Sequence, residues 1–215
     1  MTFMFSSFTG LPDRYFRGYA FSEADFISGS GGEEMFRKAT GRAITGGLDG
    51  CYIAIWKEMS KHKVGTDFNG YKKIFYYSNG SIWGFSNSLV RLADHLRENG
   101  VPLKVDAVQM RGLDIIDRSA LTEQMTSFQT LIEGIVLLPL GCELEIIENR
   151  VEVTYRGLPQ VNNYREAVRD FLECWVSRME TLISDPRVRV SCDLTGGKDS
   201  RLVFGLVMKA RQRLG

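Results

Sequence analysis

The hexapeptide Thr-Gly-Gly-Lys-Asp-Ser at residues 195–200 carries the residue types that bind phosphate groups. Its two adjacent glycines allow positive φ angles and a close approach of the backbone to an anion. The hydroxyls of Thr195 and Ser200 add hydrogen-bond donors, and Asp199 supplies a carboxylate oxygen of the kind that binds Mg²⁺. The spacing is not that of a Walker A loop, Gly-x-x-x-x-Gly-Lys-Ser/Thr. The hexapeptide therefore predicts a phosphate site of another type.

The elements on either side of the hexapeptide must position it. The apolar, β-branched run from Val188 to Leu194 predicts a strand, and apolar residues at helical spacing from Leu202 to Val207 predict a helix that begins near Ser200. The glycines would then lie at a helix N-terminus, where unpaired N–H groups and the helix dipole favour anions. An ordinary strand-to-helix turn is the alternative interpretation.

A long helix is predicted before that strand. A break at residues 157–163 is followed by Asn163 and Glu166 at capping-box spacing, and the Asp185-Pro186 pair ends the helix. The order helix, strand, glycine turn, helix is typical of the start of a parallel α/β domain. We interpret the apolar face of this helix as core packing rather than as a cofactor site. Its members are Tyr164, Val168, Phe171, Leu172, Trp175, Met179, Leu182 and Ile183.

The preceding residues, up to 157, have the pattern of antiparallel strands with a few helices. The clearest hairpin joins Ile74–Ser78 to Ile82–Ser86 through Asn79-Gly80, a pair that suits a type I′ turn. This region predicts an α+β fold with two stacked antiparallel sheets. The other elements expected are two strands before residue 30, a flexible loop at 28–34, helices at 33–39, 88–99 and 105–111, and a hairpin at 146–155.

A second Thr-Gly-Gly segment occupies residues 45–47 within Thr45–Gly50. It is followed by Cys51–Trp56, which has the composition of a strand and not of a helix. Because no helix N-terminus would face these glycines, we predict a β-turn that binds no phosphate.

Composition narrows the function classes. A formal net charge of +1 in 215 residues gives no global field for nucleic acid or an anionic membrane. The start of the chain lacks a signal-peptide pattern, and no stretch approaches the ~20 apolar residues of a membrane helix, so we expect a cytoplasmic protein. Four widely spaced cysteines predict reduced thiols rather than a zinc site. Only two histidines are present, which argues against a hydrolytic triad.

Three segments together resemble the asparagine synthetase family. Residues 195–200 resemble its pyrophosphate loop, Ser-Gly-Gly-x-Asp-Ser, with Thr195 for the first serine. Asp67–Tyr77 resembles the family segment Asp-Pro-x-Gly-x-Lys-Pro-Leu-Tyr-Tyr, and Leu131–Cys142 resembles Phe-Glu-Gly-Ile-x-x-Leu-Pro-Pro-Gly-His. The resemblance implies a glutaminase-like domain of the N-terminal nucleophile type at residues 1–157. It also implies the beginning of an ATP pyrophosphatase domain, similar to the adenine nucleotide α-hydrolases, at residues 158–215.

The chain departs from the family at the glutaminase site. The family nucleophile is an N-terminal cysteine, whereas here Thr2 follows Met1, and Thr2 would be a nucleophile only after removal of Met1. Thr66 stands where the family has an arginine that holds the glutamine carboxylate, and no Asn-Gly-Glu segment is present. The resemblance therefore implies a glutaminase scaffold without glutaminase chemistry, as in β-lactam synthetases and lasso-peptide cyclases.

The resemblance implies that ATP and Mg²⁺ bind this chain, with Asp199 positioning the metal. A small-molecule or peptide carboxylate would attack the α-phosphorus to give an acyl-adenylate and pyrophosphate, and an amine would then displace AMP. Lys198 either adds a cation near the pyrophosphate or lies solvated on the rim. The residues expected at the nucleotide are Leu194, Thr195, Gly196, Gly197, Lys198, Asp199 and Ser200.

A parallel α/β domain needs more strands than residues 188–215 supply. We therefore expect an N-terminal fragment of an amide-forming ligase, inactive by itself, or a chain whose sheet is completed by another chain. Apolar surface left exposed on an incomplete domain would favour self-association. The alternative is a non-catalytic binding or assembly module with a degenerate glutaminase fold.

Overall fold

The computed structural model describes residues 2–115, 127–157 and 159–215, and its strands form two antiparallel sheets. The smaller sheet has the order β1-β7-β6-β8 and the larger sheet the order β10-β9-β5-β4-β2-β3. The strands of the smaller sheet are β1 (Met4–Ser6), β6 (Phe75–Ser78), β7 (Trp83–Ser86) and β8 (Ile135–Leu137). Those of the larger sheet are β2 (Arg14–Ser22), β3 (Asp25–Ser28), β4 (Asp49–Glu58), β5 (Lys61–Thr66), β9 (Cys142–Ile147) and β10 (Arg150–Tyr155).

Strand β4 is buried on both faces of the larger sheet. Because side chains alternate along a strand, Ile53 and Ile55 face the smaller sheet while Tyr52, Ala54 and Trp56 face the opposite side. The core between the two sheets is formed by Phe3, Ile53, Ile55, Val64, Ile74, Trp83, Phe85, Leu144 and Ile146.

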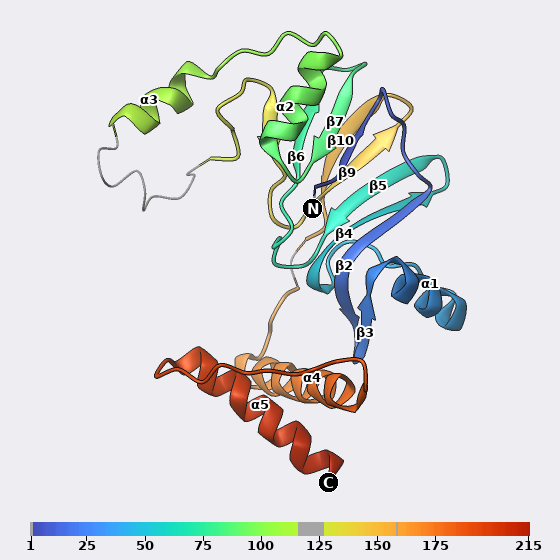
Figure 1. Ribbon diagram of the computed structural model, residues 1–215, viewed down its shortest axis with the longest axis vertical. Helices are drawn as coiled ribbons and strands as arrows, with labels where there is room; N and C mark the ends of the chain where they lie inside the picture. Colours follow the sequence, from blue (N-terminus) through green and yellow to red (C-terminus); the bar gives the residue numbers. More distant parts are fainter. Residues whose placement is uncertain (1, 116–126, 158) are drawn as a thin grey trace.

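Each sheet is covered on its outer face by one helix, which gives four layers in the order helix, sheet, sheet, helix (Figure 1). Helix α1 (Gly29–Thr40) packs Phe36 against the larger sheet, and α2 (Leu89–Glu98) packs Leu92 and Leu96 against the smaller sheet. The predicted α+β fold with two stacked antiparallel sheets is confirmed at this level.

Two local predictions need correction. Asn79-Gly80 does not form a two-residue type I′ turn, because Ser78 pairs with Trp83 and leaves a four-residue loop. The Asn79 side chain closes this loop by accepting a hydrogen bond from the Ile82 N–H at 3.0 Å. Residues 29–34 are helical rather than a loop, since α1 begins at Gly29 and its packing against the sheet outweighs the low helix propensity of glycine.

Several predicted starts and hairpins are confirmed. Ser88 caps α2 by accepting from the Arg91 N–H, and Asp106 precedes α3 (Ala107–Ile115) and accepts from the Val108 N–H. Strands β9 and β10 form the second predicted hairpin. The four cysteines are unpaired and half-buried, so they are less buried than core positions.

A pair of helices follows the sandwich. Helix α4 (Tyr164–Ser184), capped by the Asn163 side chain as predicted, packs against α5 (Lys198–Leu214) through Val176, Leu206 and Ala210. None of the described helices has the length and apolar composition needed to cross a membrane.

The strand predicted at Val188–Leu194 is wrong. The segment between the two helices runs back alongside α4 and contains no strand (Figure 1). A strand exists only when a neighbour accepts and donates its backbone hydrogen bonds, and no described strand pairs with this segment.

The outer layer formed by α2 can be tested through Leu92, which is fully buried. We expect Leu92→Ala to lower the free energy of unfolding by about 2–5 kcal/mol, because it leaves a cavity between α2 and the sheet. Val90 is 69% exposed on the same helix, so Val90→Ala should change stability by less than about 0.5 kcal/mol. Urea unfolding measures both values, and equal effects would contradict the assigned layer.

Candidate phosphate-binding site

The predicted helix N-terminus is present at the start of α5. Helix α5 begins at Lys198, and Gly197 is its N-cap residue with φ −72° and ψ 160°. No side chain caps this end, and the first N–H groups of a helix have no partners within the helix. Residues 193–199 are exposed, so these N–H groups are open to a ligand. This arrangement favours an anion.

Two hydroxyls hold the loop in place. The Oγ1 of Thr195 and the Oγ of Ser200 lie 2.9 Å apart, and the Thr195 N–H donates to Ser200 Oγ at 3.2 Å. The Gly197 N–H donates to Thr195 Oγ1 at 3.3 Å. The hydroxyls predicted as phosphate donors therefore first fix the loop against the first turn of α5.

The two glycines of this loop do not have the positive φ angles expected from the sequence. Gly197 has a negative φ, and Gly196 is also outside the left-handed region. What distinguishes Gly196 is space, because a Cβ built there would have no neighbouring atom within 4 Å. A group as large as a methyl could occupy this position without displacing any described residue, so the backbone is accessible at close range.

The other Thr-Gly-Gly segment is closed to a ligand. Gly47 has φ +90° and a Cβ there would overlap the Arg156 guanidinium, while a Cβ on Gly46 would lie 2.5 Å from Glu143 Oε1. The Gly47 N–H already donates to the Thr66 carbonyl at 2.9 Å. These glycines are required by their neighbours, and the segment leads into β4, so the predicted β-turn is confirmed.

The ion pair that covers this turn is itself buried. Arg156 Nε lies 3.1 Å from Glu143 Oε1, and the Glu143 side chain is only 9% exposed. Burial raises the pKa of Glu143, and the nearby guanidinium of Arg156 opposes that rise. The turn at residues 45–47 is therefore a packed structural feature rather than an anion site.

The charged residues of the α5 loop remain accessible. Lys198 and Asp199 are exposed, and Arg201 donates its Nε–H to the Gly197 carbonyl at 3.2 Å. Within the described residues, no three His, Cys, Asp or Glu side chains cluster as a metal site. Asp199 would therefore hold Mg²⁺ only together with ligand phosphate oxygens and water, which is the usual way that Mg²⁺ binds. Leu194 is 60% exposed beside the loop.

The residues that would mark a glutaminase site have other partners. The Thr2 hydroxyl accepts a hydrogen bond from Arg91 at 2.7 Å. Behind Thr2, the rings of Phe3 and Phe5 pack against Tyr15 and Phe85, with centroid separations from 5.1 to 6.3 Å. Aromatic side chains therefore fill the space between the sheets next to the first strand.

The family-like segment that begins at Asp67 has a structural explanation. Asp67 is fully buried, and its two carboxylate oxygens accept from the N–H groups of Tyr71 and Lys72 at 2.8 and 3.0 Å. Gly70 has φ +61°, which this turn requires and glycine supplies at no cost. The segment shapes a loop between β5 and β6.

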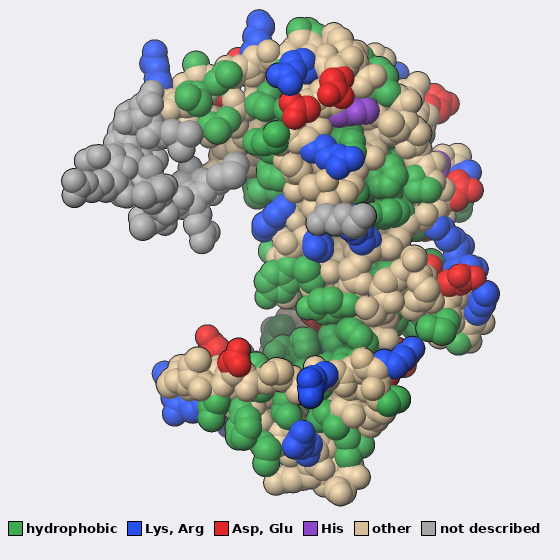
Figure 2. All heavy atoms as spheres, viewed as in Figure 1, with side chains coloured by type: hydrophobic (Ala, Val, Ile, Leu, Met, Phe, Trp, Pro, Cys, Tyr) green, Lys and Arg blue, Asp and Glu red, His purple; other side chains and the backbone are tan. Residues whose placement is uncertain are grey.

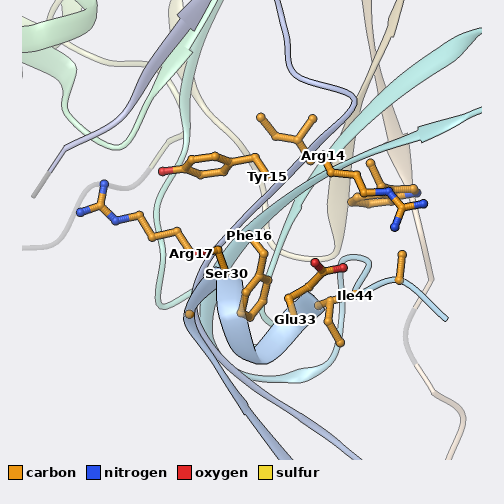
Figure 3. A pocket seen from close by; sticks show the side chains of 11 residues that line it. Arg14, Tyr15, Phe16, Arg17, Ser30, Glu33 and Ile44 are labelled. Atoms are coloured by element: carbon orange, nitrogen blue, oxygen red, sulfur yellow. The ribbon is translucent and has the colours of Figure 1, made fainter. Parts of the chain in front are cut away.

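A cavity that sequence reasoning missed lies on the sandwich. Its volume is about 560 Å³, and Phe16, Ile44 and Trp56 form an apolar wall while Arg14 and Glu33 supply charge (Figure 3). These residues come from β2, α1, β4 and the loop before β4, and their spacing carries no sequence signal. None of the residues predicted to bind nucleotide lines this cavity.

Comparison of the chain with protein-family models and with curated proteins finds no match. Its function is therefore inferred from the loop at the start of α5 and from the residues that surround it.

Substitution of glycine by alanine should affect the stability of the chain differently in the two Thr-Gly-Gly segments. Gly196→Ala should change the free energy of unfolding by less than about 0.5 kcal/mol, because neither φ nor space opposes a methyl group. Gly47→Ala should destabilise by about 1–3 kcal/mol, because it strains φ and displaces Arg156. Thermal unfolding of the two variants measures the contrast. A large loss of stability in Gly196→Ala would show that the loop is packed rather than open.

Asp185 anchors the start of the segment that leads to the loop. It accepts from the Arg187 N–H, Nε–H and Nη2–H at 2.7–2.9 Å, and these side-chain and backbone hydrogen bonds lower its pKa from 3.8 to about 2. Because the Asp185 pKa is lower in the folded chain than its ordinary value of 3.8, the ionised carboxylate stabilises the fold at pH values above 3.8. This stabilisation is lost as the pH falls toward 2. NMR titration should show the Asp185 pKa rising toward 3.8 in Arg187→Gln. An unchanged pKa in that variant would contradict the anchor.

Proposed function

We propose that this chain is the N-terminal part of an ATP-dependent amide-forming ligase, in which residues 194–200 hold the pyrophosphate portion of ATP. The observation that carries the proposal is the open backbone at Gly196, directly before an uncapped helix N-terminus. Its contrast with the occluded Gly47 supports a ligand site, because neither its conformation nor its packing against the described residues calls for glycine at residue 196.

The residues of the loop fit a phosphate ligand in distinct ways. The first N–H groups of α5 would face phosphate oxygens, and Thr195 and Ser200 keep the loop in the shape that presents them. Asp199 would position Mg²⁺, and Lys198 is free to approach the same anion. When bound, ATP supplies the energy that activates a carboxylate towards an amine. The loop contributes fixed donors that neutralise the leaving pyrophosphate.

In this proposal the sandwich is a scaffold of the N-terminal nucleophile type that hydrolyses no glutamine. The hydrogen bond between Thr2 and Arg91 supports it, because the Thr2 hydroxyl already has a partner within the chain. The attacking amine then comes from the substrate, and the activated carboxylate belongs to a small molecule or a peptide.

The helix pair has the apolar surface that such an ATP domain needs. Phe171 is 52% exposed on α4, and Leu202, Phe204 and Met208 are 40–50% exposed on α5. Figure 2 shows these helices with apolar side chains at the surface between basic ones. In the proposed ligase, further strands cover these apolar side chains, supplied by the same polypeptide or by another chain.

The same exposed face also favours a second candidate, a non-catalytic module that binds a partner protein through the helix pair. Exposed apolar patches are typical of interaction surfaces. The two candidates differ in whether the loop at residues 194–200 binds nucleotide.

Titration calorimetry with ATP and Mg²⁺ separates the two candidates. We expect the chain to bind Mg-ATP weakly and Asp199→Ala to lower the affinity about tenfold or more, because it removes a charge-assisted contact to the metal. Asp193→Ala is the matched control, since Asp193 is an exposed acid just outside the loop. Thr195→Val should also weaken binding, whereas Thr45→Val in the closed segment should not. Equal affinity for the unchanged chain and Asp199→Ala would overturn the role of the loop.

A further inference from the structure

One arginine joins the helix pair to the sandwich. Arg178 lies in the middle of α4 and is only 5% exposed, although its side chain is charged. Its Nη1 donates to Asp49 Oδ2 at 2.8 Å, and its Nε donates to the Glu23 carbonyl at 2.9 Å. A buried guanidinium is tolerated only with such partners, because removing it from water is otherwise costly.

Aromatic rings complete the surroundings of this guanidinium. Its central carbon lies 4.7 Å from the ring centre of Trp175 on α4 and 5.1 Å from that of Phe21 on β2. The two rings also meet edge to face at 5.6 Å. Each contact attracts the cation, and together they place Arg178 between the two parts of the chain.

The carbonyl that accepts from Arg178 belongs to a tight hairpin turn of the sandwich. Glu23 has φ +54° in the β2–β3 turn, a left-handed conformation that is unfavourable for a residue with a side chain. Its carbonyl is the one that accepts from Arg178. Met59 and Glu148 have nearly the same φ in the other two-residue turns, so hairpin geometry accounts for this conformation, and the turn presents its carbonyl to Arg178.

The second acceptor, Asp49, lies just after the Thr-Gly-Gly segment at residues 45–47. That turn leads directly into β4, whose first residue is Asp49. The next residue, Gly50, has φ +148°, and a Cβ there would lie 2.2 Å from the Tyr19 carbonyl. The turn and the close approach of the backbone set the position from which Asp49 reaches Arg178.

The packing continues from Arg178 to α5, the helix that begins at the phosphate loop. Val176 and Met179 on the same helix pack against the cluster that contains Leu206 and Ala210 of α5. Towards the C-terminal end of α4, a groove of about 590 Å³ separates this helix from α1, so packing there is open. Arg178 and its neighbours therefore form the closely packed part of the joint between the helix pair and the sandwich.

We propose that Arg178 is a positioning residue, which docks α4 on Asp49 and Glu23 and thereby fixes the loop at residues 195–200 relative to the sandwich. This inference rests on the proposed nucleotide-binding function of that loop. According to this proposal, the sandwich contributes to ATP binding by holding the helix pair, whose second member, α5, begins at the loop. The sandwich itself does not contact the nucleotide.

Hydrogen exchange and calorimetry on the 215-residue chain test the two parts of the inference. In Arg178→Met, peptides from the middle of α4 should exchange about tenfold faster, because a buried charge-assisted contact is lost. The affinity for Mg-ATP should fall about fivefold or more. Arg178→Lys keeps the charge opposite Asp49 and should restore part of both effects. Arg213→Met is the matched control, since Arg213 pairs with Glu173 at 2.7 Å within the helix pair.

The possible results are distinct. The core of the sandwich should unfold at the same temperature in Arg178→Met as in the original chain. If α4 then exchanges at the same rate in both proteins, the docking role is overturned. Faster exchange with unchanged Mg-ATP affinity would overturn the positioning role alone. An unchanged chain that binds no Mg-ATP would overturn the proposed function and the positioning role with it, while the exchange data would still decide whether Arg178 docks the helix.

Discussion

Burial of strand β4 on both faces is the constraint on which the rest of the structure depends. Ile53 and Ile55 face the second sheet, while Tyr52 and Trp56 face the cluster beneath α1, so neither layer can form without this strand. The same strand begins with Asp49, the acceptor of Arg178. One strand therefore joins three parts of the molecule, and the position of α4 is linked to the packing of the sandwich core.

The two Thr-Gly-Gly segments have the same residues in opposite surroundings. At Gly47 the glycine is needed because Arg156 and a positive φ leave no room for a side chain. At Gly196 no described neighbour needs a glycine, and the backbone is open in front of a helix N-terminus. The difference lies in what surrounds each glycine, and it supports a structural role for the first segment and the ligand role that we propose for the second.

The proposed ligase gives each part of the chain a task. The sandwich provides a packed base, and aromatic rings fill its core next to the first strand. The helix pair presents the loop and an apolar surface, and Arg178 joins the two parts. A fold can be kept when a catalytic activity is absent, because the side chains that form the core are not the side chains that catalyse a reaction.

The sequence by itself determined the elements with strong local signals. Alternating apolar residues identified the sheets, and Asn163 and Ser88 identified helix starts, because both signals act over a few residues. It failed at Val188–Leu194, since strand composition cannot supply the hydrogen-bonding neighbour that a strand requires. Only the tertiary structure decided which glycine is open, what Arg178 contacts and where the cavity beside Glu33 lies. Those features depend on contacts between side chains that are distant in sequence, and no local sequence pattern predicts such contacts.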